Sequence, residues 1–222
     1  MLKLIIGNKA YSSWSMRGWL AAKQSDLPFE ELVVPMFGEE WSQAREGDEF
    51  APSSGKVPIL WDGDTVVWDS LAIVEYLAEK SKRDRFWPAD AAARGMARSM
   101  AAEMHSSFAN LRREHSMNVR KIFPRKDLSP AVREEVERIL MLWAQARARF
   151  AGTGDFLFGD WCAADIMYAP VVTRFASYSI ALAPFAQAYA RAVLEHPHVR
   201  EWIEAAQDEP WVIEKYEVEA EG

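Results

Sequence analysis

The sequence contains little cysteine, little histidine and no excess of positive charge. With one cysteine in 222 residues, Cys162, a framework of intrachain disulfides is excluded. Cys162 and four scattered histidines also lack the spacing of metal ligands, so we expect no metal site. The formal net charge of -7 argues against nucleic acid as a partner, because binding a phosphate backbone requires clustered positive charge.

Long hydrophobic runs are absent as well. No apolar stretch approaches the roughly 20 residues that span a bilayer, and strand-like residues begin at Leu2 with no separate signal region. We therefore expect a cytoplasmic protein with no membrane partner. Hydrophobic residues make up 50% of the chain, which is enough to build a large core.

Short strand and helix patterns alternate over the first third of the chain. They predict strands at Leu2–Ile6, 29–34, 59–61 and Thr65–Val67, helices at 13–24 and Ser70–Lys80, and an irregular acidic stretch that holds Trp41. This order is typical of a thioredoxin-like α/β domain, which we place at residues 1–82. Residues 83–90, with Pro88, are predicted to be a linker.

The remaining chain, residues 89–222, has an all-helical pattern. One predicted helical face repeats at every fourth residue from Met96 to Phe108 and continues to Leu111, and a second runs from Val132 to Phe150. Pro170 is predicted to bend a helix over residues 165–175, because it removes one backbone hydrogen bond. Two further helices are predicted at 184–194 and 197–207, followed by a loosely held acidic tail after residue 211.

Two short segments about ten residues apart predict a surface that grips a small peptide. A Val57-Pro58 step adopts the cis isomer at little cost, which turns the Val57 backbone groups toward a ligand. Asp69 and Ser70 precede an apolar helical pattern, so a helix N-terminus with its unpaired N–H groups lies there. Ser70 can bond a carboxylate while Asp69 pairs with an ammonium group. Glutathione has the peptide edge, the α-carboxylate and the α-amine that this arrangement requires.

These segments, together with two others, resemble the glutathione transferase superfamily over nearly the whole chain. The matching residues are Lys56 to Pro58, Asp69-Ser70, the run from Tyr11 to Arg17, and residues 159–166, which resemble the buried capping box of the family. The resemblance implies a homodimer that uses glutathione as co-substrate and transfers it to a small electrophile, as in detoxification. It also implies that Lys56 pairs with the glycyl carboxylate and that Trp41 closes over the same end of the ligand. An ordinary solvated lysine is the alternative at residue 56.

A hydroxyl group near the first helix is the expected activator of the glutathione thiol. In the family the catalytic residue commonly stands five residues before an arginine, and Arg17 makes Ser12 the match, with Ser13 as the alternative and Tyr11 ranked below both. A thiol beside a helix N-terminus and a hydroxyl donor has a lowered pKa, and the thiolate is the nucleophile. The same serines can also serve only as helix caps.

The co-substrate pocket is expected to contain Trp14, His105 and Phe108. Trp14 stands where zeta-class members have cysteine, and its indole favours flat or apolar co-substrates unless it only packs between the domains. His105 would add one basic group if it faces the cleft. The neighbouring pair Arg112 and Arg113 is interpreted as part of a solvated charged face.

Two other functions stay open at this point. One is a zeta-like, glutathione-dependent cis-trans isomerase of the maleylacetoacetate type, which the serine motif favours and Trp14 disfavours. The other is a binding module without catalysis, since folds of this kind also serve in interaction.

In the second half of the chain, Asp165 is expected to cap a helix together with a buried and inert Cys162.

Overall fold

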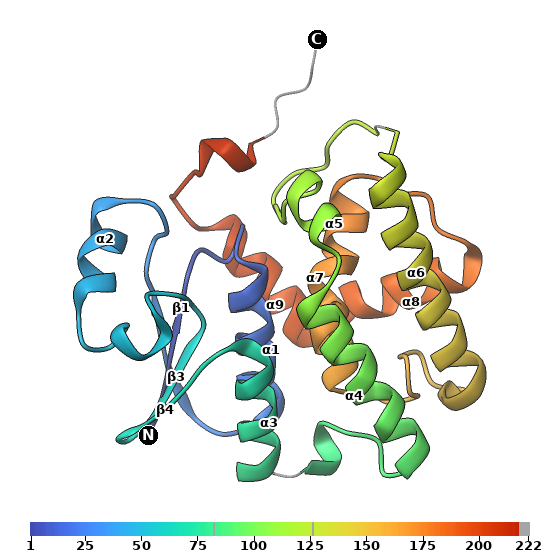
Figure 1. The fold of residues 1–222 in the computed structure, drawn as a ribbon, viewed down its shortest axis with the longest axis horizontal. Coiled ribbons are helices and arrows are strands. Elements are labelled where there is room, and N and C mark those ends of the chain that lie inside the picture. The colour runs from blue at the N-terminus through green and yellow to red at the C-terminus, as the bar shows by residue number, and fades with distance from the viewer. Residues whose placement is uncertain (82, 126, 218–222) are drawn as a thin grey trace.

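The computed structural model describes residues 1–81, 83–125 and 127–217 and consists of a sheet-containing half and a helical half (Figure 1). The sheet has four strands in the order β2-β1-β3-β4. β1 pairs in parallel with β2 and antiparallel with β3, which pairs antiparallel with β4. The strands span Leu2–Ile6 (β1), Phe29–Val33 (β2), Ile59–Asp62 (β3) and Thr65–Val67 (β4).

Alternate residues of β1 face two different layers, as expected for extended chain. Leu4 and Ile6 pack against α1 (Ser13–Ser25) and α3 (Ser70–Lys80) in the main core. Ile5 points to the other face and packs with Trp41 of α2 (Glu39–Glu46). Helices therefore cover both faces of the sheet, and the predicted thioredoxin-like arrangement of this half is confirmed.

The helical half is built around α7 (Ala163–Ser177), in which 14 of 15 residues are buried. It packs against α4 (Ala91–Ser106), α8 (Pro184–Glu195) and also α1, so it joins the two halves of the molecule. α5 (Ala109–Glu114), α6 (Pro130–Ala146) and α9 (Pro197–Gln207) complete this layer. The predicted all-helical second half is confirmed, while the domain limits at 82 and 89 stay predictions, with residue 82 outside the described residues.

The start of α7 carries the predicted capping box. Asp165 Oδ2 accepts the Cys162 N–H at 2.9 Å, and its Oδ1 accepts the Leu157 N–H at 3.1 Å. Leu157, Cys162 and Asp165 are all buried, and burial raises the pKa of Asp165 to about 6. Cys162 is buried as predicted, and burial raises the pKa of its thiol well above the ordinary value, which keeps it protonated. Pro170 lies inside the helix, also as predicted.

Three sequence-based expectations about local structure are wrong. The acidic stretch around Trp41 is the helix α2 rather than irregular chain. The helical face predicted from Met96 to Leu111 is interrupted, because Phe108 adopts a φ of 62° and separates α4 from α5. The tail predicted to be loosely held is fixed as far as Glu217, whose carboxylate accepts hydrogen bonds from Tyr11 and Asn118, and residues 218–222 lie outside the described residues.

Two smaller differences concern the ends of predicted segments. Phe86 lies in the predicted linker, yet it is fully buried in the core. The helix predicted from Val132 to Phe150 is the α-helix α6, which ends at Ala146 and is followed by a π-helix over Arg147–Ala151.

Candidate functional site

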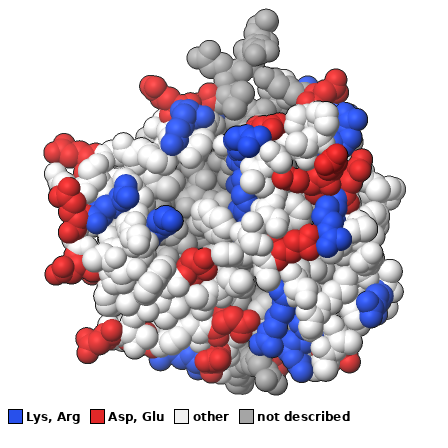
Figure 2. Space-filling model, viewed as in Figure 1, with Lys and Arg blue, Asp and Glu red and all other residues white. Residues whose placement is uncertain are grey.

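A cavity of about 790 Å³ lies between the sheet half and His105 of α4. It brings together six of the predicted glutathione-binding or catalytic residues, from the β1–α1 loop, α2, the loop before β3 and the start of α3. These are Ser12, Trp41, Lys56, Val57, Pro58 and Asp69, and further lining residues are Trp14, Met36, Phe37, Arg45, Ser53, Ser54, Gly55, Trp68 and His105. Acidic side chains gather along the α2 edge of this face of the molecule (Figure 2).

Ser12 is the N-cap of α1, with an extended backbone. Its Oγ accepts the Ser15 N–H at 3.3 Å and lies 2.8 Å from Ser15 Oγ, to which it donates. Ser15 Oγ in turn accepts the Gly7 N–H at 2.9 Å. The two hydroxyls are therefore coupled, and because hydroxyl hydrogens rotate, the Ser15 hydroxyl can donate to Ser12 Oγ and release the Ser12 proton for a ligand.

The loop that carries Ser12 is fixed from the far end of the chain. The Glu209 carboxylate accepts the backbone N–H groups of Lys9 at 2.6 Å and Ala10 at 3.0 Å. These bonds join residues 200 and 199 positions apart. Their direct effect is to hold the backbone just before the α1 cap.

The two alternative hydroxyl donors are each engaged by other side chains. Ser13 Oγ accepts a hydrogen bond from Arg174 Nη2 at 3.2 Å. Tyr11 donates to Glu217 at 2.6 Å and accepts from Arg120 at 2.5 Å, and burial is the main cause that raises the pKa of its phenol. Neither residue lines the larger cavity, whereas Ser12 does.

The predicted cis peptide between Val57 and Pro58 is confirmed. Gly18 of α1 lies so close to the Pro58 ring that a Cβ there would stand 2.8 Å from it, so glycine is required at this approach. Ser53 supports the same loop, since its Oγ accepts the Lys56 N–H and donates to the Lys56 carbonyl. Lys56 is exposed, as a solvated lysine would be, but it also lines the cavity.

Asp69 caps α3 and also reaches the opposite wall of the cavity. Its Oδ1 accepts the Leu71 N–H at 3.0 Å, and its Oδ2 lies 2.5 Å from His105 Nε2 on α4. Ser70 is fully buried, and its Oγ has no hydrogen-bond partner in the described part of the chain. Ser70 does not line the cavity, so its predicted contact with a carboxylate stays a prediction.

Of the three residues predicted for the co-substrate, two reach the cavity. His105 faces it and packs edge-on against Trp14, with ring centroids 5.3 Å apart. Phe108 instead belongs to the hydrophobic core, and it lines neither this cavity nor the smaller one beside it.

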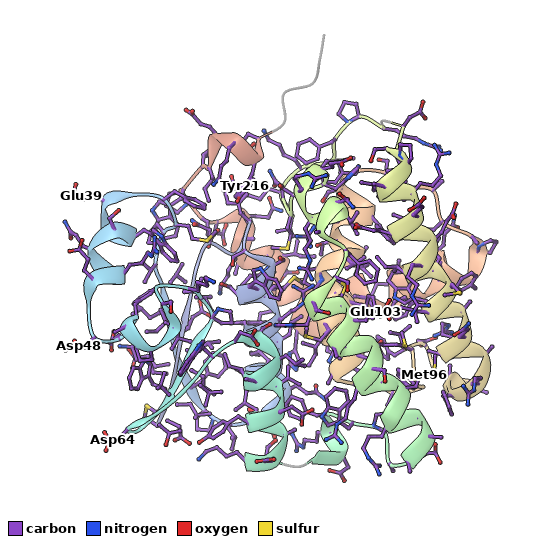
Figure 3. The ribbon with its side chains drawn as sticks, in the orientation of Figure 1. Glu39, Asp48, Asp64, Met96, Glu103 and Tyr216 are labelled. Carbon is purple, nitrogen blue, oxygen red and sulfur yellow. The ribbon has the colours of Figure 1, made fainter. Side chains whose placement is uncertain are left out.

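A second cavity of about 290 Å³ adjoins the first and shares Ser12, Trp14, Met36 and Phe37 with it. Tyr216 closes one side between the two halves of the molecule, where Figure 3 labels it.

Arg112 and Arg174 also line the smaller cavity, and sequence reasoning missed both as site residues. Arg113 is exposed as predicted, but Arg112 is half-buried, so its assignment to a solvated face is wrong. Arg45 of the larger cavity was also missed. The single arginine inside the apolar helix α7 was a signal that could have identified Arg174.

Within the described residues, no group of histidine, cysteine and acidic side chains has the arrangement of a metal site. Nor does any helix in the described ranges combine the length and the hydrophobicity that crossing a membrane requires.

Comparisons with known proteins support one family. Residues 11–80 match the family model for the glutathione S-transferase N-terminal domain. The chain is 24% identical over 196 residues to glutathione S-transferase GstB of Escherichia coli (strain K12), covering 87% of this chain and 88% of GstB.

Solved structures share the fold. A glutathione transferase homolog from Burkholderia GL BGR1, with bound glutathione, is 22% identical with a TM-score of 0.68 and covers 93% of this chain and 98% of its own. Maleyl pyruvate isomerase, described as a bacterial glutathione S-transferase in zeta class, is 22% identical with a TM-score of 0.66 and covers 93% and 99%.

Proposed function

Because the chain belongs to the glutathione S-transferase superfamily, we propose that it activates the thiol of glutathione for attack on a small electrophile. The observation that carries this proposal is the position of Ser12. Among the three candidate hydroxyl donors, Ser12 lines the same cavity as Val57, Pro58 and Asp69. The donor and the peptide-binding groups can therefore act on one ligand.

The charges of the cavity complement those of glutathione. Asp69 is the partner for the α-ammonium group, and the unpaired N–H groups at the start of α3 favour the neighbouring α-carboxylate. Lys56 and Arg45 line the same cavity and supply positive charge for the glycyl carboxylate. The Val57 backbone offers hydrogen bonds to the cysteinyl peptide groups, and the Trp41 ring covers this side of the ligand.

Thiolate formation is the chemical step that the protein assists. The glutathione thiol releases its proton to solvent, and the Ser12 hydroxyl donates a hydrogen bond to the sulfur anion that remains. The dipole of α1 adds to this stabilisation, because Ser12 stands at the helix N-terminus. The thiolate then forms a carbon–sulfur bond with the electrophile, whose leaving group departs with its electron pair. Ser15 acts as a positioning residue that turns its own proton toward Ser12.

The test is a titration of the glutathione thiolate by its ultraviolet absorbance in the complex. In the wild-type complex the thiol should be ionised near neutral pH, whereas a free thiol titrates at about 8.5. Ser12→Ala should raise the thiol pKa by about 1 to 2 units, which corresponds to about 1.4 to 2.7 kcal/mol. It should also lower the rate at neutral pH while leaving glutathione affinity nearly unchanged.

Ser13→Ala and Tyr11→Phe are the matched controls, and both should leave the titration as it is. If the thiol pKa shifts in Ser13→Ala alone, Ser13 is the hydroxyl donor and the mechanism is otherwise unchanged. If the wild-type complex titrates like free glutathione, the protein does not activate the thiol, and the binding-module function replaces the proposal.

The zeta-like isomerase remains the second candidate, because the serines at positions 12, 13 and 15 fit its motif. In that reaction the thiolate adds to a maleyl double bond, and glutathione leaves after rotation about the carbon–carbon bond. Incubation with a maleyl substrate separates the two functions, since isomerisation returns free glutathione and conjugation consumes it. A cytoplasmic homodimer with a role in detoxification is part of the same proposal.

A further inference from the structure

Three arginine side chains from three helices gather around Ser13 and Trp14. The guanidinium carbons of Arg17 and Arg112 lie 5.0 Å and 4.6 Å from the centre of the Trp14 ring. Arg174 donates to Ser13 Oγ at 3.2 Å. Arg17 and Arg174 are 0% and 4% exposed, and Arg112 is half-buried, so two positive charges are removed from water in one small region and a third is partly shielded from it.

No carboxylate neutralises these charges within the described residues. The three side chains form no ion pair there, and their acceptors are backbone carbonyls and one hydroxyl. These acceptors are the carbonyls of Ser13, Met104, Ser107, His115, Met167 and Pro170, and Ser13 Oγ. Glu135 favours the charged form of Arg112, but its oxygens accept hydrogen bonds from Asn110 and Leu111.

Two guanidinium nitrogens in this cluster lack any acceptor in the described ranges. They are Arg17 Nη2 and Arg112 Nη1, and both are buried. A buried charged donor without a partner is costly, and an anion would satisfy it. Burial is the main cause that lowers the pKa of Arg112 to about 10 and that of Arg174 to about 9, and the Arg112 charge also lowers the latter.

We propose that the smaller cavity is an anion subsite that holds the carboxylate of an acidic electrophile, with Arg112 and Arg174 as its ligands and Arg17 behind them. This rests on the proposed function, because the subsite matters for the co-substrate of the glutathione thiol. Guanidinium groups suit this task, since their planar donors match a carboxylate and stay charged.

The position of the subsite fits a role beside the reacting sulfur. Ser12 and Trp14 line both cavities, whereas Val57, Pro58 and Asp69 line only the larger one, so an acid held in the smaller cavity lies next to Ser12 without displacing a ligand from the peptide-binding groups. A volume of about 290 Å³ admits only a small co-substrate, and the rings of Trp14 and Tyr216 favour a flat one. The expected class is therefore a small aromatic or unsaturated carboxylic acid.

The test compares two electrophiles that differ only in the carboxyl group. In both 4-chloro-3-nitrobenzoate and its methyl ester, glutathione displaces chloride, which leaves with the electrons of the broken carbon–chlorine bond. After division by the uncatalysed rate constants, wild type should favour the acid over the ester in kcat/KM. Arg112→Met should lower kcat/KM for the acid by about 10- to 100-fold, the loss expected for hydrogen bonds to charged groups, and leave the ester unchanged.

Arg113→Met is the matched control, because Arg113 is the neighbouring arginine, is exposed and pairs with Glu114. This substitution should leave kcat/KM unchanged for both substrates. Should Arg112→Met fail to fold, Arg112→Lys keeps the charge but loses the planar fork, and a smaller selective loss for the acid is expected. Equal losses for acid and ester, or a wild type without preference for the acid, would overturn the proposal and leave the arginines as structural ties.

A binding measurement distinguishes this proposal from the proposed function. Calorimetric titration with 3-nitrobenzoate and with nitrobenzene needs no reaction. Tighter binding of 3-nitrobenzoate to wild type than to Arg112→Met supports the subsite, whether or not the two electrophiles react. If neither electrophile reacts, that result counts against thiol activation but not against the subsite. Equal binding of both compounds to both proteins would refute the subsite.

Discussion

An aspartate caps the start of each of the helices α3 and α7, Asp69 as the N-cap residue and Asp165 as the third helical residue, but the two carboxylates lie in opposite surroundings. The Asp69 side chain is 49% exposed, accepts the Leu71 N–H and also contacts His105 across the larger cavity. Asp165 is 0% exposed, and its two oxygens accept the N–H groups of Leu157 and Cys162. One carboxylate is accessible to a ligand, whereas the other is enclosed by the protein.

The difference shows that a local capping pattern determines where a helix starts but not what else the cap does. Solvent screens the charge of Asp69, so this charge contributes little to stability and is available to an ammonium group. Burial makes the hydrogen bonds of Asp165 structural, because removing the carboxylate leaves two buried donors unpaired.

Replacing Asp165 should have the largest effect on stability. Asp165→Ala leaves two buried N–H groups without acceptors, so we expect the free energy of unfolding to fall by about 3 kcal/mol. Urea unfolding measures this loss, and the exposed Asp160→Ala is the control. Glutathione affinity per folded molecule should be unchanged, and lost affinity at full folding would place Asp165 in the binding site.

Replacing Asp69 should instead affect the ligand. Asn caps helices as well as Asp does, so Asp69→Asn should keep the melting temperature while removing the charge that pairs with the glutathione ammonium. The expected loss of affinity is about tenfold or more, because hydrogen bonds between charged groups contribute roughly 1.5 to 3 kcal/mol. Calorimetric titration measures it, with Asp64→Asn at the exposed β3–β4 turn as the control (Figure 3). Unchanged affinity would remove Asp69 from the site.

A third prediction concerns the pH dependence of stability. Burial raises the pKa of Asp165 in the folded protein to about 6, above the ordinary value of 3.8, so the folded state binds the proton more tightly than the unfolded state. Its contribution to stability is therefore present at low pH and is lost as the pH rises through about 6.

The measurement compares wild type with Asp165→Asn by urea unfolding at pH 5 and pH 7. The wild-type advantage should be larger at pH 5 by about 1 to 2 kcal/mol. An advantage that is the same at both values, or larger at pH 7, would contradict a raised pKa.

Removing the Ser70 hydroxyl should have the smallest effect on stability. Its Oγ is buried without a partner in the described residues, so Ser70→Ala removes an unsatisfied group and should change the free energy of unfolding by less than about 0.5 kcal/mol. If the hydroxyl turns toward the α-carboxylate of glutathione when the ligand binds, affinity should fall severalfold. Unchanged affinity would assign anion binding at α3 to its backbone N–H groups alone.

Much of the sheet half was predictable from sequence, because its elements carry clear local signals. The apolar pattern of Leu2–Ile6 predicted β1. The capping residue Asp69 predicted the start of α3. Around α2 such a signal was absent, since Trp41 is the only buried residue of this helix and no apolar periodicity results. At Phe108 the periodicity itself was misleading, because an apolar residue at the expected spacing gives no sign of a left-handed backbone.

The site was predictable where its residues follow one another and not where the fold assembles them. Ser12 and Asp69 belong to short motifs that can be recognised alone. The arginine cluster depends on the packing of α1, α5 and α7, and the spacing along the chain does not show that Arg112 and Arg174 share one cavity. The contact between Asp69 and His105 likewise required the packing of α3 against α4.

The bonds from Glu209 to Lys9 and Ala10 have a consequence for the synthesis of the chain. The ribosome makes the Ser12 loop before the carboxylate that holds it, which is added 200 residues after Lys9. At a synthesis rate of about 5 to 20 residues per second, the two amides remain without this partner for about 10 to 40 s. The sheet half can therefore begin to fold on the ribosome, but the loop before the proposed thiol activator obtains its final hydrogen bonds only after Glu209 has been translated.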